Sequence, residues 1–190
     1  MTQPKILTFA ASTRSKSLNR KLAHLVTKRF AAHGAQTESI DLAEYALPFY
    51  DGDLEAQAGI PEAAHRLHEK FRSNAGIFIA SPEMNANVSP LLLNVFAWVS
   101  RIGDHGGMAA AFAKPVFALG SASPGGFGGY RGLMSLRNSL ELQLGARVLP
   151  TMVSVGTAHE AFDDDGDLKH PFPNQMLGRL VPELLSAASN

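Results

Sequence analysis

The chain reads Ala11-Ser12-Thr13-Arg14-Ser15-Lys16-Ser17-Leu18-Asn19-Arg20 between a short apolar run, Lys5–Ala10, and a segment with helical periodicity. The apolar run predicts a buried strand. In the segment that follows, apolar residues recur at the spacing of one helix face, which predicts an amphipathic helix. These residues are Leu18, Leu22, Leu25, Val26 and Phe30. A turn rich in hydroxyls and cations therefore joins a strand to a helix.

This turn has the chemistry of a phosphate site. The start of a helix holds unpaired backbone N–H groups and the positive end of the helix dipole. Arg14, Lys16 and the neighbouring serines add positive charge and hydroxyl donors, and the first acidic residue of the chain is Glu38. Together these features predict phosphate binding at the helix start. In the alternative interpretation, Ser17 only caps the helix and the cations are solvated.

The composition restricts the class of protein. With 190 residues, 45% apolar and 18% charged, the chain is expected to form one globular domain over residues 1–190. The formal net charge of zero argues against binding of nucleic acid or of an anionic membrane over a broad face. There is no cysteine, which excludes disulfides, thiolate catalysis and cysteine-ligated iron–sulfur clusters. Any redox activity must therefore depend on a bound cofactor.

No segment has the pattern of a membrane span. The longest apolar stretch, Val88–Val99, is interrupted by polar residues and is too short to cross a bilayer, so we expect no membrane insertion. The N-terminus lacks the apolar core of a signal peptide, although it shares its cation-rich composition with transit peptides. Because Lys5–Ala10 has the pattern of a core strand, we expect a mature cytoplasmic protein.

Strand-like and helix-like segments alternate along the chain. We expect strands at Lys5–Ala10, Gln36–Leu42, Gly76–Ala80, Pro115–Leu119 and Val148–Val155. We expect helices from Leu18 to before Gly34, from Pro61 to about Arg72, from Ser89 or Pro90 to about Ile102, over Tyr130–Leu144, and from about Asn174 to Ala188, with Ala46–Gly59 as a loop. Five βα units predict an α/β fold with a doubly wound five-stranded parallel sheet, order 2-1-3-4-5, in a three-layer αβα sandwich.

In such a sheet, ligands lie beyond the carboxyl ends of the strands, beside the point where the strand order reverses. The loops after the first, third and fourth strands should therefore carry unusual chemistry. After the third strand comes Ser81–Asn87, which contains Pro82, Glu83 and two asparagines. After the fourth comes Gly120–Gly132, which is rich in glycine and serine. Both segments meet the expectation.

The three loops together resemble those of one known family. The first matches the pattern Ser-x-Arg-x-x-Ser-x-Asn at Ser12, Arg14, Ser17 and Asn19. The second resembles a Pro-Glu-Tyr-Asn loop and the helix after it, at Pro82, Glu83, Asn85, Pro90, Leu91, Leu92, Asn94, Trp98, Ser100 and Arg101. The third is glycine-rich and precedes a leucine-rich helix. From about Lys5 to Pro150 the chain resembles the NADPH-dependent FMN reductase family, a flavodoxin-like group that includes quinone and chromate reductases.

The resemblance implies an FMN site. Ser12, Arg14, Ser17, Leu18 and Asn19 would hold the phosphate. Pro82, Glu83, Met84 and Asn85 would run along the isoalloxazine ring, and Ser121, Ser123 and Gly126 would close its other side. Proline and glycine loops allow the backbone to approach a flat ring closely, and redox chemistry without cysteine requires such a cofactor. No side chain is assigned a catalytic role, and no metal site is expected.

The chain departs from the family pattern at three positions. Met84 stands where the family has tyrosine, Leu93 where it has lysine, and Ala97 where it has aspartate. The last two changes make the helix Pro90–Ile102 apolar nearly all round, and such a helix must be buried. We infer a homodimer or a dimer of dimers that covers it. The alternative is burial within one chain.

Other patterns point to weaker candidates. The acidic run Asp163–Asp167 is similar to a calcium loop but lacks both end ligands, so we expect a solvated turn. His65 and His68 lie three residues apart without an evident third ligand, and we expect exposed helix histidines rather than a metal site. Gly126-x-Gly128 does not complete a dinucleotide fingerprint. Trp98, inside an apolar run, is expected in the core or an interface.

The resemblance implies an FMN-dependent NAD(P)H oxidoreductase. Electrons would pass from NADPH or NADH through FMN to a quinone, a free flavin or another small acceptor. One alternative is a flavodoxin-type electron carrier, which the zero net charge disfavours because such carriers dock through an acidic face. Another alternative is a flavin-binding module without turnover, because Met84 replaces the tyrosine of the family. The sequence leaves the acceptor, the preferred nicotinamide and the flavin potential undecided.

Overall fold

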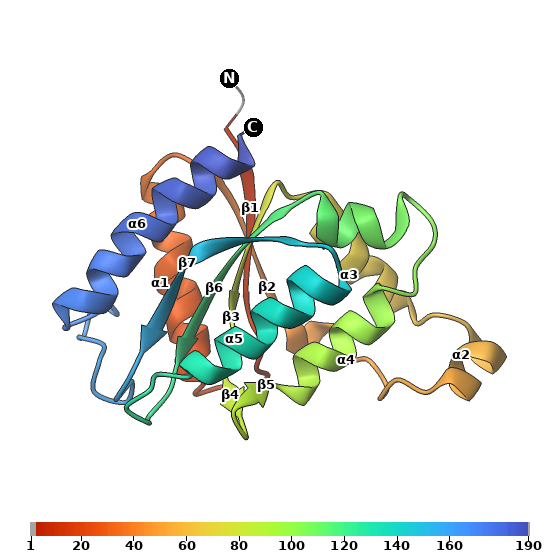
Figure 1. Cartoon of the computed structure of the whole chain (residues 1–190), viewed down its shortest axis with the longest axis horizontal. Helices are drawn as coiled ribbons and strands as arrows, with labels where there is room; N and C mark the ends of the chain where they lie inside the picture. Colours follow the sequence, from red (N-terminus) through yellow and green to blue (C-terminus); the bar gives the residue numbers. More distant parts are fainter. Residues whose placement is uncertain (1–2, 190) are drawn as a thin grey trace.

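The computed structural model describes residues 3–189. Its centre is a parallel five-stranded sheet of order β2-β1-β3-β6-β7, shown in Figure 1. The strands are β1 (Lys5–Ala10), β2 (Gln36–Asp41), β3 (Gly76–Ala80), β6 (Val116–Ala122) and β7 (Arg147–Val155). The observed order corresponds to the predicted 2-1-3-4-5, so the fold prediction is confirmed.

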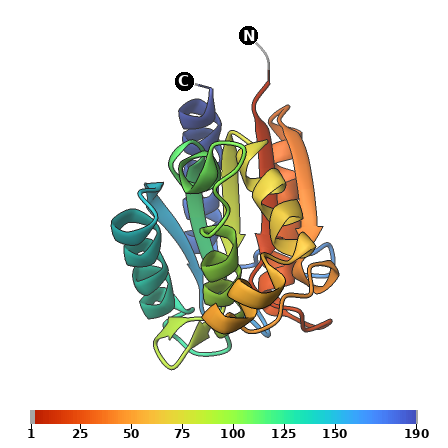
Figure 2. The ribbon, with the colours of Figure 1, turned by 90° about the vertical axis from the view of Figure 1, so that its right-hand side faces the viewer.

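Helices cover both faces of the sheet (Figures 1 and 2). One face packs against α1 (Leu18–Ala32) and α6 (Pro171–Ala188). The other packs against α3 (Glu62–Arg72), α4 (Pro90–Val99) and α5 (Tyr130–Asn138). The result is the three-layer, flavodoxin-like sandwich that the alternating pattern predicts.

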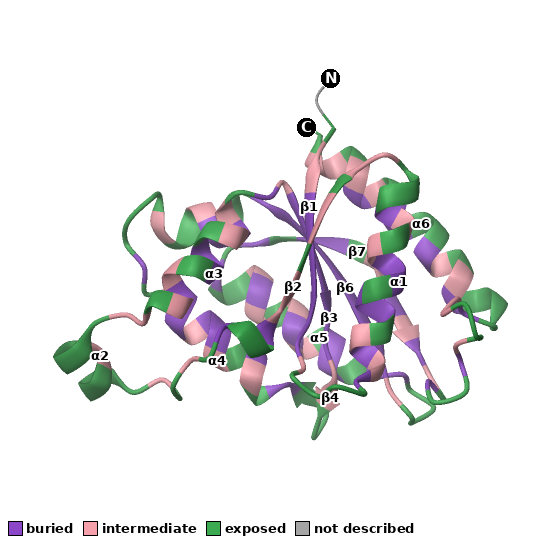
Figure 3. Ribbon diagram, turned by 180° about the vertical axis from the view of Figure 1, so that it is seen from behind, coloured by how far each residue is buried: buried purple, intermediate pink, exposed green. Residues whose placement is uncertain are grey.

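The core lies along both faces of the sheet, and Figure 3 shows β3 and β6 as buried, whereas the edge strand β2 is intermediate to exposed. All residues of β3 are buried, as expected for a central strand that reads as an unbroken apolar run. On α1, the predicted stripe is buried at Leu22, Leu25, Val26 and Phe30, whereas Leu18 is half-buried. Each fully buried side chain of this kind contributes about 1.5–3 kcal/mol.

The segment predicted as a loop, Ala46–Gly59, contains a short helix, α2 (Gly52–Ala58), after a 3₁₀ turn, η1 (Leu42–Glu44). The Asp51 carboxylate caps α2 by accepting from the N–H groups of Asp53 and Leu54. No residue of α2 is buried, and it lies at the edge of the molecule in Figure 1. Without an apolar stripe, periodicity gives no signal for such a helix.

Two helical segments differ from the predicted ones. The segment expected as one helix, Tyr130–Leu144, is α-helical only to Asn138 and continues as a π-helix, η3 (Ser139–Gln143). A second π-helix, η2 (Ala109–Ala113), precedes β6. In addition, α6 begins at Pro171 rather than at Asn174, since proline suits the first turn of a helix.

The segment after β3 forms a small hairpin of β4 (Glu83–Met84) and β5 (Asn87–Val88). Its two turn residues have positive φ, 51° at Asn85 and 59° at Ala86, the pattern of a type I′ turn. Asparagine tolerates this region better than alanine does, since its short polar side chain bonds locally. The hairpin projects from the carboxyl edge of the sheet (Figure 2).

The expectation of exposed helix histidines is wrong for His68. This side chain is 2% exposed, and its Nε2 donates to the carbonyl oxygen of Gly107, 2.9 Å away. The bond ties α3 to the loop before η2, a contact between segments that no local pattern reveals. His65 is half-buried. Within residues 3–189, no group of three or more His, Asp or Glu side chains is arranged to hold a metal ion.

Most of the apolar surface of α4 is buried within the chain. The buried residues are Leu92, Val95, Phe96, Trp98 and Val99. Trp98 also donates from Nε1 to the carbonyl oxygen of Pro48 at 2.8 Å. Leu93, however, remains 41% exposed. Among the helices of residues 3–189, none is long and apolar enough to cross a membrane.

Candidate functional site

A cavity of about 400 Å³ lies at the carboxyl edge of the sheet. It is formed by the turn between β1 and α1, by the segments that follow β3 and β6, and by one residue from the segment after β7. The lining residues are Ser12, Arg14, Lys16, Ser17, Leu18, Asn19, Pro82, Glu83, Met84, Ala122, Ser123, Pro124 and His159. We call this the cofactor cavity.

One end of the cofactor cavity is a helix start with free donors. The Ser17 hydroxyl caps α1 by accepting from the Arg20 N–H at 3.4 Å. The N–H groups of Leu18 and Asn19 donate to no residue in the described part of the chain. Arg14 and Lys16 are exposed and form no ion pair within residues 3–189. Capping by Ser17 therefore leaves the anion-binding capacity of this end intact.

The side chain of Asn19 joins two walls of the cavity. Its Nδ2 donates to the carbonyl oxygen of Ala122 at 3.0 Å, and its Oδ1 accepts from the N–H of the same residue at 2.9 Å. The amide is buried, so both bonds are shielded from water. Asn19 thus fixes α1 against the end of β6, and its side chain is already hydrogen-bonded.

On the opposite wall, Glu83 holds the hairpin to α5. Its Oε1 accepts from Arg131 Nε at 3.0 Å and its Oε2 accepts from the Gly132 N–H at 3.1 Å. The Arg131 guanidinium keeps the pKa of Glu83 below its usual range. Next to this anchor, Met84 is 48% exposed at the mouth of the cavity.

The glycine-rich loop after β6 covers Ser121. A Cβ at Gly129, where φ is 84°, would lie 2.0 Å from the Ser121 hydroxyl oxygen, so only glycine fits there. Ser121 is fully buried beneath this loop and does not line the cofactor cavity. Asn85 and Gly126 are also absent from its lining. The structure brings the other residues of the sequence-based site together.

Sequence reasoning missed His159. Backbone bonds of 3.0 Å from Ser123 N to Val155 O, and from Ala158 N to Ser123 O, carry this residue to the cavity. The turn includes Thr157 at φ 47°, and strain of this kind costs about 1–3 kcal/mol and gathers at functional sites. The one feature of the sequence that could have predicted His159 is its position after β7, since the carboxyl end of this strand lies at the same edge of the sheet as the other loops of the cavity.

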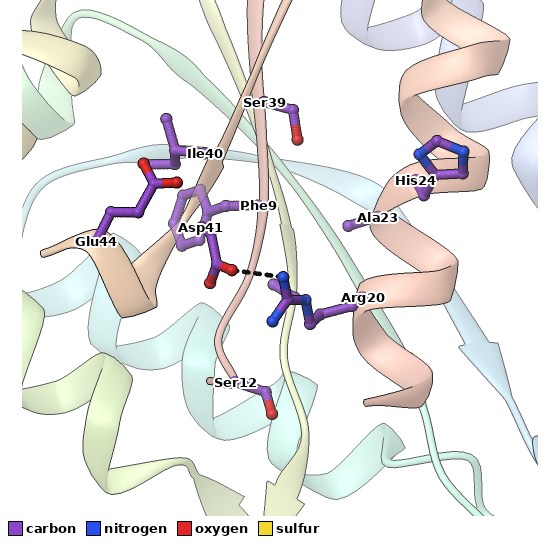
Figure 4. A pocket seen from close by; sticks show the side chains of 10 residues that line it. Phe9, Ser12, Arg20, Ala23, His24, Ser39, Ile40, Asp41 and Glu44 are labelled. Atoms are coloured by element: carbon purple, nitrogen blue, oxygen red, sulfur yellow. Dashed lines mark hydrogen bonds and ion pairs between the residues drawn. The ribbon is translucent and has the colours of Figure 1, made fainter. Parts of the chain in front are cut away.

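A second cavity, of about 380 Å³, shares Ser12 with the first. Figure 4 shows it between α1 and the end of β2, with an ion pair between Arg20 and Asp41 inside it. We call this the edge cavity. Its lining is mostly polar, in contrast to the sheet core beneath it.

Comparison with known proteins identifies the family. The sequence model described as NADPH-dependent FMN reductase matches residues 4–160. A quinone reductase of Pseudomonas putida is 32% identical over 164 residues, 86% of this chain and 83% of that protein. An NAD(P)H-dependent FMN reductase of Pseudomonas aeruginosa is 33% identical over 131 residues, 68% of each chain.

Solved structures show the same fold. The flavoenzyme NAD(P)H:(acceptor) oxidoreductase FerB from Paracoccus denitrificans has a TM-score of 0.78 at 23% identity, covering 98% of this chain and 97% of that one. All the residues that line the cofactor cavity lie within the matched residues 4–160. On the strength of these matches and of the three loops at one sheet edge, the chain belongs to the NADPH-dependent FMN reductase family.

Proposed function

We propose that the protein is an FMN-dependent NAD(P)H oxidoreductase that passes electrons to a quinone, a flavin or another small acceptor. The observation that carries this proposal is the cofactor cavity, which joins a cationic helix start to a mouth bordered by prolines and Met84. Its volume of about 400 Å³ suits a small-molecule site. The matched relatives are quinone and FMN reductases, which supports the same chemistry.

The residues present fit the phosphate end of FMN. The free N–H groups of Leu18 and Asn19 and the hydroxyls of Ser12 and Ser17 are donors, and Arg14 can add a charge-assisted hydrogen bond. A phosphate dianion placed there meets no unpaired carboxylate, because Glu83 is held by Arg131. The donor set therefore matches the group.

The other end of the cavity fits a flat ring. Pro82, Met84 and Pro124 supply apolar surface, and the hairpin supplies backbone polar groups next to it. Bound FMN would supply two-electron chemistry between NAD(P)H and the acceptor. The chain's own residues bind and orient the cofactor, and they set the polarity around it. We assign no side chain as acid or base.

We further propose that the chain acts as one FMN-binding domain, in the cytoplasm where NAD(P)H is available, and as a homodimer or a dimer of dimers. Support for assembly comes from exposed apolar residues: Leu93 on α4 and Leu142 on η3, which is 84% exposed. A shallow groove of about 230 Å³ lies beside Leu93, lined also by Phe96 and Ala97. Two-fold closure is the usual way to cover such a face. Sedimentation as a monomer at high micromolar concentration would contradict this.

The function is tested in two steps. Calorimetry on the cofactor-free protein should show FMN binding, and absence of binding at tens of micromolar would contradict the proposal. Stopped-flow mixing of the FMN-loaded protein with NADH or NADPH should then bleach the flavin absorbance, and a panel of quinones and flavins should restore it. FMN binding without bleaching by either nicotinamide would instead support an electron carrier or a flavin-binding module.

A further inference from the structure

The turn after β7 that carries His159 is held firmly to the loop after β6. Backbone hydrogen bonds join the two segments, and the Ser154 hydroxyl also donates to the Phe127 carbonyl oxygen at 2.8 Å. The segments approach so closely that a Cβ at Gly156 would lie 2.6 Å from the carbonyl oxygen of Gly126. The backbone around His159 therefore has little freedom to move relative to the cofactor cavity.

The same turn lies beside α1, whose start forms the phosphate end of the cavity. Ala158 and Ala161, which flank His159, are both fully buried and belong to the same apolar cluster as the buried residues of α1. Further along the turn, the ring of Phe162 lies under Lys21 of α1, with 6.0 Å between Nζ and the ring centroid. His159 is thus held on the α1 side of the cavity.

The imidazole of His159 is available to a ligand although its backbone is anchored. The side chain is 53% exposed and lines the cofactor cavity. Within residues 3–189 its one ion-pair contact is with Glu160, whose Oε1 lies 3.5 Å from Nε2 and whose side chain is 73% exposed. A contact between two exposed groups at this distance contributes little, so it does not compete with a bound ligand.

The charged groups around His159 favour an anion. They are Arg14 and Lys16 from the turn before α1, Lys21 from α1, Glu83 from the hairpin and Glu160 from its own turn. Three of these are cations, and Glu83 is already held by Arg131. The loop after β6 brings Ser123 and Pro124, which carry no charge. Positive charge therefore exceeds the negative charge that is left uncompensated on this side of the cavity.

We propose that His159 is a further ligand of the FMN phosphate and adds a charge-assisted hydrogen bond from its imidazolium to those of Arg14 and the start of α1. The proposal rests on the proposed function, since it needs FMN in the cofactor cavity. Imidazole gains its charge between about pH 8 and pH 5, whereas arginine and lysine stay charged throughout. His159 therefore makes the affinity for FMN depend on pH, and the affinity for riboflavin, which has no phosphate, does not depend on it.

The test measures the dissociation constants of FMN and riboflavin by flavin fluorescence with the cofactor-free protein over a range of pH. His159→Gln keeps an N–H donor without charge, and His159→Lys carries a charge throughout the range. The matched control is His170→Gln, because His170 is exposed, ends the same connection between β7 and α6, and lies outside the cofactor cavity. The phosphate itself gains a proton near about pH 6, and comparing proteins at equal pH removes this effect.

We expect His159→Gln to weaken FMN about 2-fold at about pH 8 and about 10-fold at about pH 5.5, where the imidazole of the original chain is charged. His159→Lys should restore FMN binding at the lower pH to within about 3-fold of the original chain. His170→Gln should change the affinity for FMN by no more than about 2-fold at either pH. Riboflavin affinity should stay within about 2-fold in every variant.

The proposal is overturned if the loss of FMN affinity in His159→Gln is the same at both pH values, or if riboflavin loses as much affinity as FMN. It is also overturned if His159→Lys binds FMN as weakly as His159→Gln at the lower pH, or if His170→Gln has an equal effect. If the original chain binds no FMN at any pH, the proposed function is wrong as well, which distinguishes that failure from these.

Discussion

Glu83 on β4 and Arg131 in the first turn of α5 form an ion pair that joins two loops of the cofactor cavity. The Nε–Oε1 distance is 3.0 Å, and the second carboxylate oxygen accepts from the Gly132 N–H at 3.1 Å. Only 9% of the Glu83 side chain is exposed, against 58% for Arg131. The shielded carboxylate thus fixes the hairpin, and with it the backbone at Met84, relative to the glycine-rich loop.

Glu83→Gln should loosen this arrangement. An amide keeps one acceptor but loses the charge, so we expect a loss of about 1–3 kcal/mol in stability and several-fold weaker FMN binding. Urea unfolding and flavin fluorescence titration measure the two effects. Glu69→Gln, which removes an exposed ion pair on α3, is the control and should cost no more than about 0.5 kcal/mol. A lower stability with unchanged FMN affinity would mean that the pair has no role at the cofactor.

Arg14→Ala should weaken FMN far more than riboflavin. The variant removes a charge-assisted contact to the phosphate, about 1.5–3 kcal/mol or about 10- to 150-fold in affinity. Fluorescence titration of both flavins gives the ratio. The control Lys28→Ala, on α1 and outside the cavity, should change the affinity of neither flavin. Equal losses for FMN and riboflavin would show that Arg14 lies away from the phosphate.

Ala86→Gly should stabilise the protein. Ala86 has φ 59° in the hairpin turn, and glycine adopts this region without a Cβ clash. After the larger entropy loss of glycine on folding, a gain of about 0.5–1 kcal/mol remains, or about 1–4 °C in Tm. Ala31→Gly, at an exposed helical position of α1, should have the opposite sign. If both variants lower the Tm, the claim that Ala86 is strained in the hairpin turn is wrong.

Glu38 should make stability depend on acid pH. Burial raises the pKa of its carboxyl, but hydrogen bonds from Lys5, Lys70 and Asn74 outweigh burial and lower the pKa from 4.5 to about 2. Because the folded pKa lies below the unfolded one, the contribution is complete above pH 4.5 and is lost as the pH falls toward 2.

The variant Glu38→Gln should be less stable than the original chain by about 1–3 kcal/mol at pH 7. The difference should shrink steadily from pH 4.5 to pH 2 in urea unfolding curves. If the difference in the free energy of unfolding between the two proteins stays constant over this range, the Glu38 carboxylate is not stabilised by its two lysines.

Met84→Tyr should change acceptor preference more than cofactor affinity. Met84 lines the cavity and is half exposed, so a tyrosine ring has room there. FMN affinity should stay within a few-fold, because binding depends on backbone groups and the phosphate, whereas transition-state geometry is sensitive to shifts of about 1 Å. Steady-state kinetics with several acceptors and melting curves measure both effects. A lowered Tm of about 2–4 °C or more, from overpacking, with unchanged acceptor preference would contradict this placement.

Local sequence predicted β1, β3, β6 and β7 because their residues are mainly apolar and are bounded by turn residues, whereas the mostly polar β2 gave a weaker signal. Gly76–Ala80 and Lys5–Ala10 were predicted with the bounds they have in the structure. The short helix α2 was missed since it buries no residue, and the π-helix after Asn138 was missed since its apolar spacing is close to that of an α-helix. Nine of the twelve predicted site residues line the cofactor cavity, because their loops follow strands that end at one edge of the sheet, whereas Asn85, Ser121 and Gly126 do not line it.

The sequence alone determined the order of the elements, the cationic turn at the start of α1 and the absence of thiol chemistry, since these depend on residues close together in the chain. Tertiary structure decided which side chains remain available to a ligand. Packing buried Ser121 beneath Gly129, committed Asn19 to Ala122 and carried His159 to the cofactor cavity. These outcomes depend on contacts between different segments of the chain; Asn19 and Ala122, for example, lie 103 residues apart. Such hydrogen bonds and close approaches exist only once the core has formed.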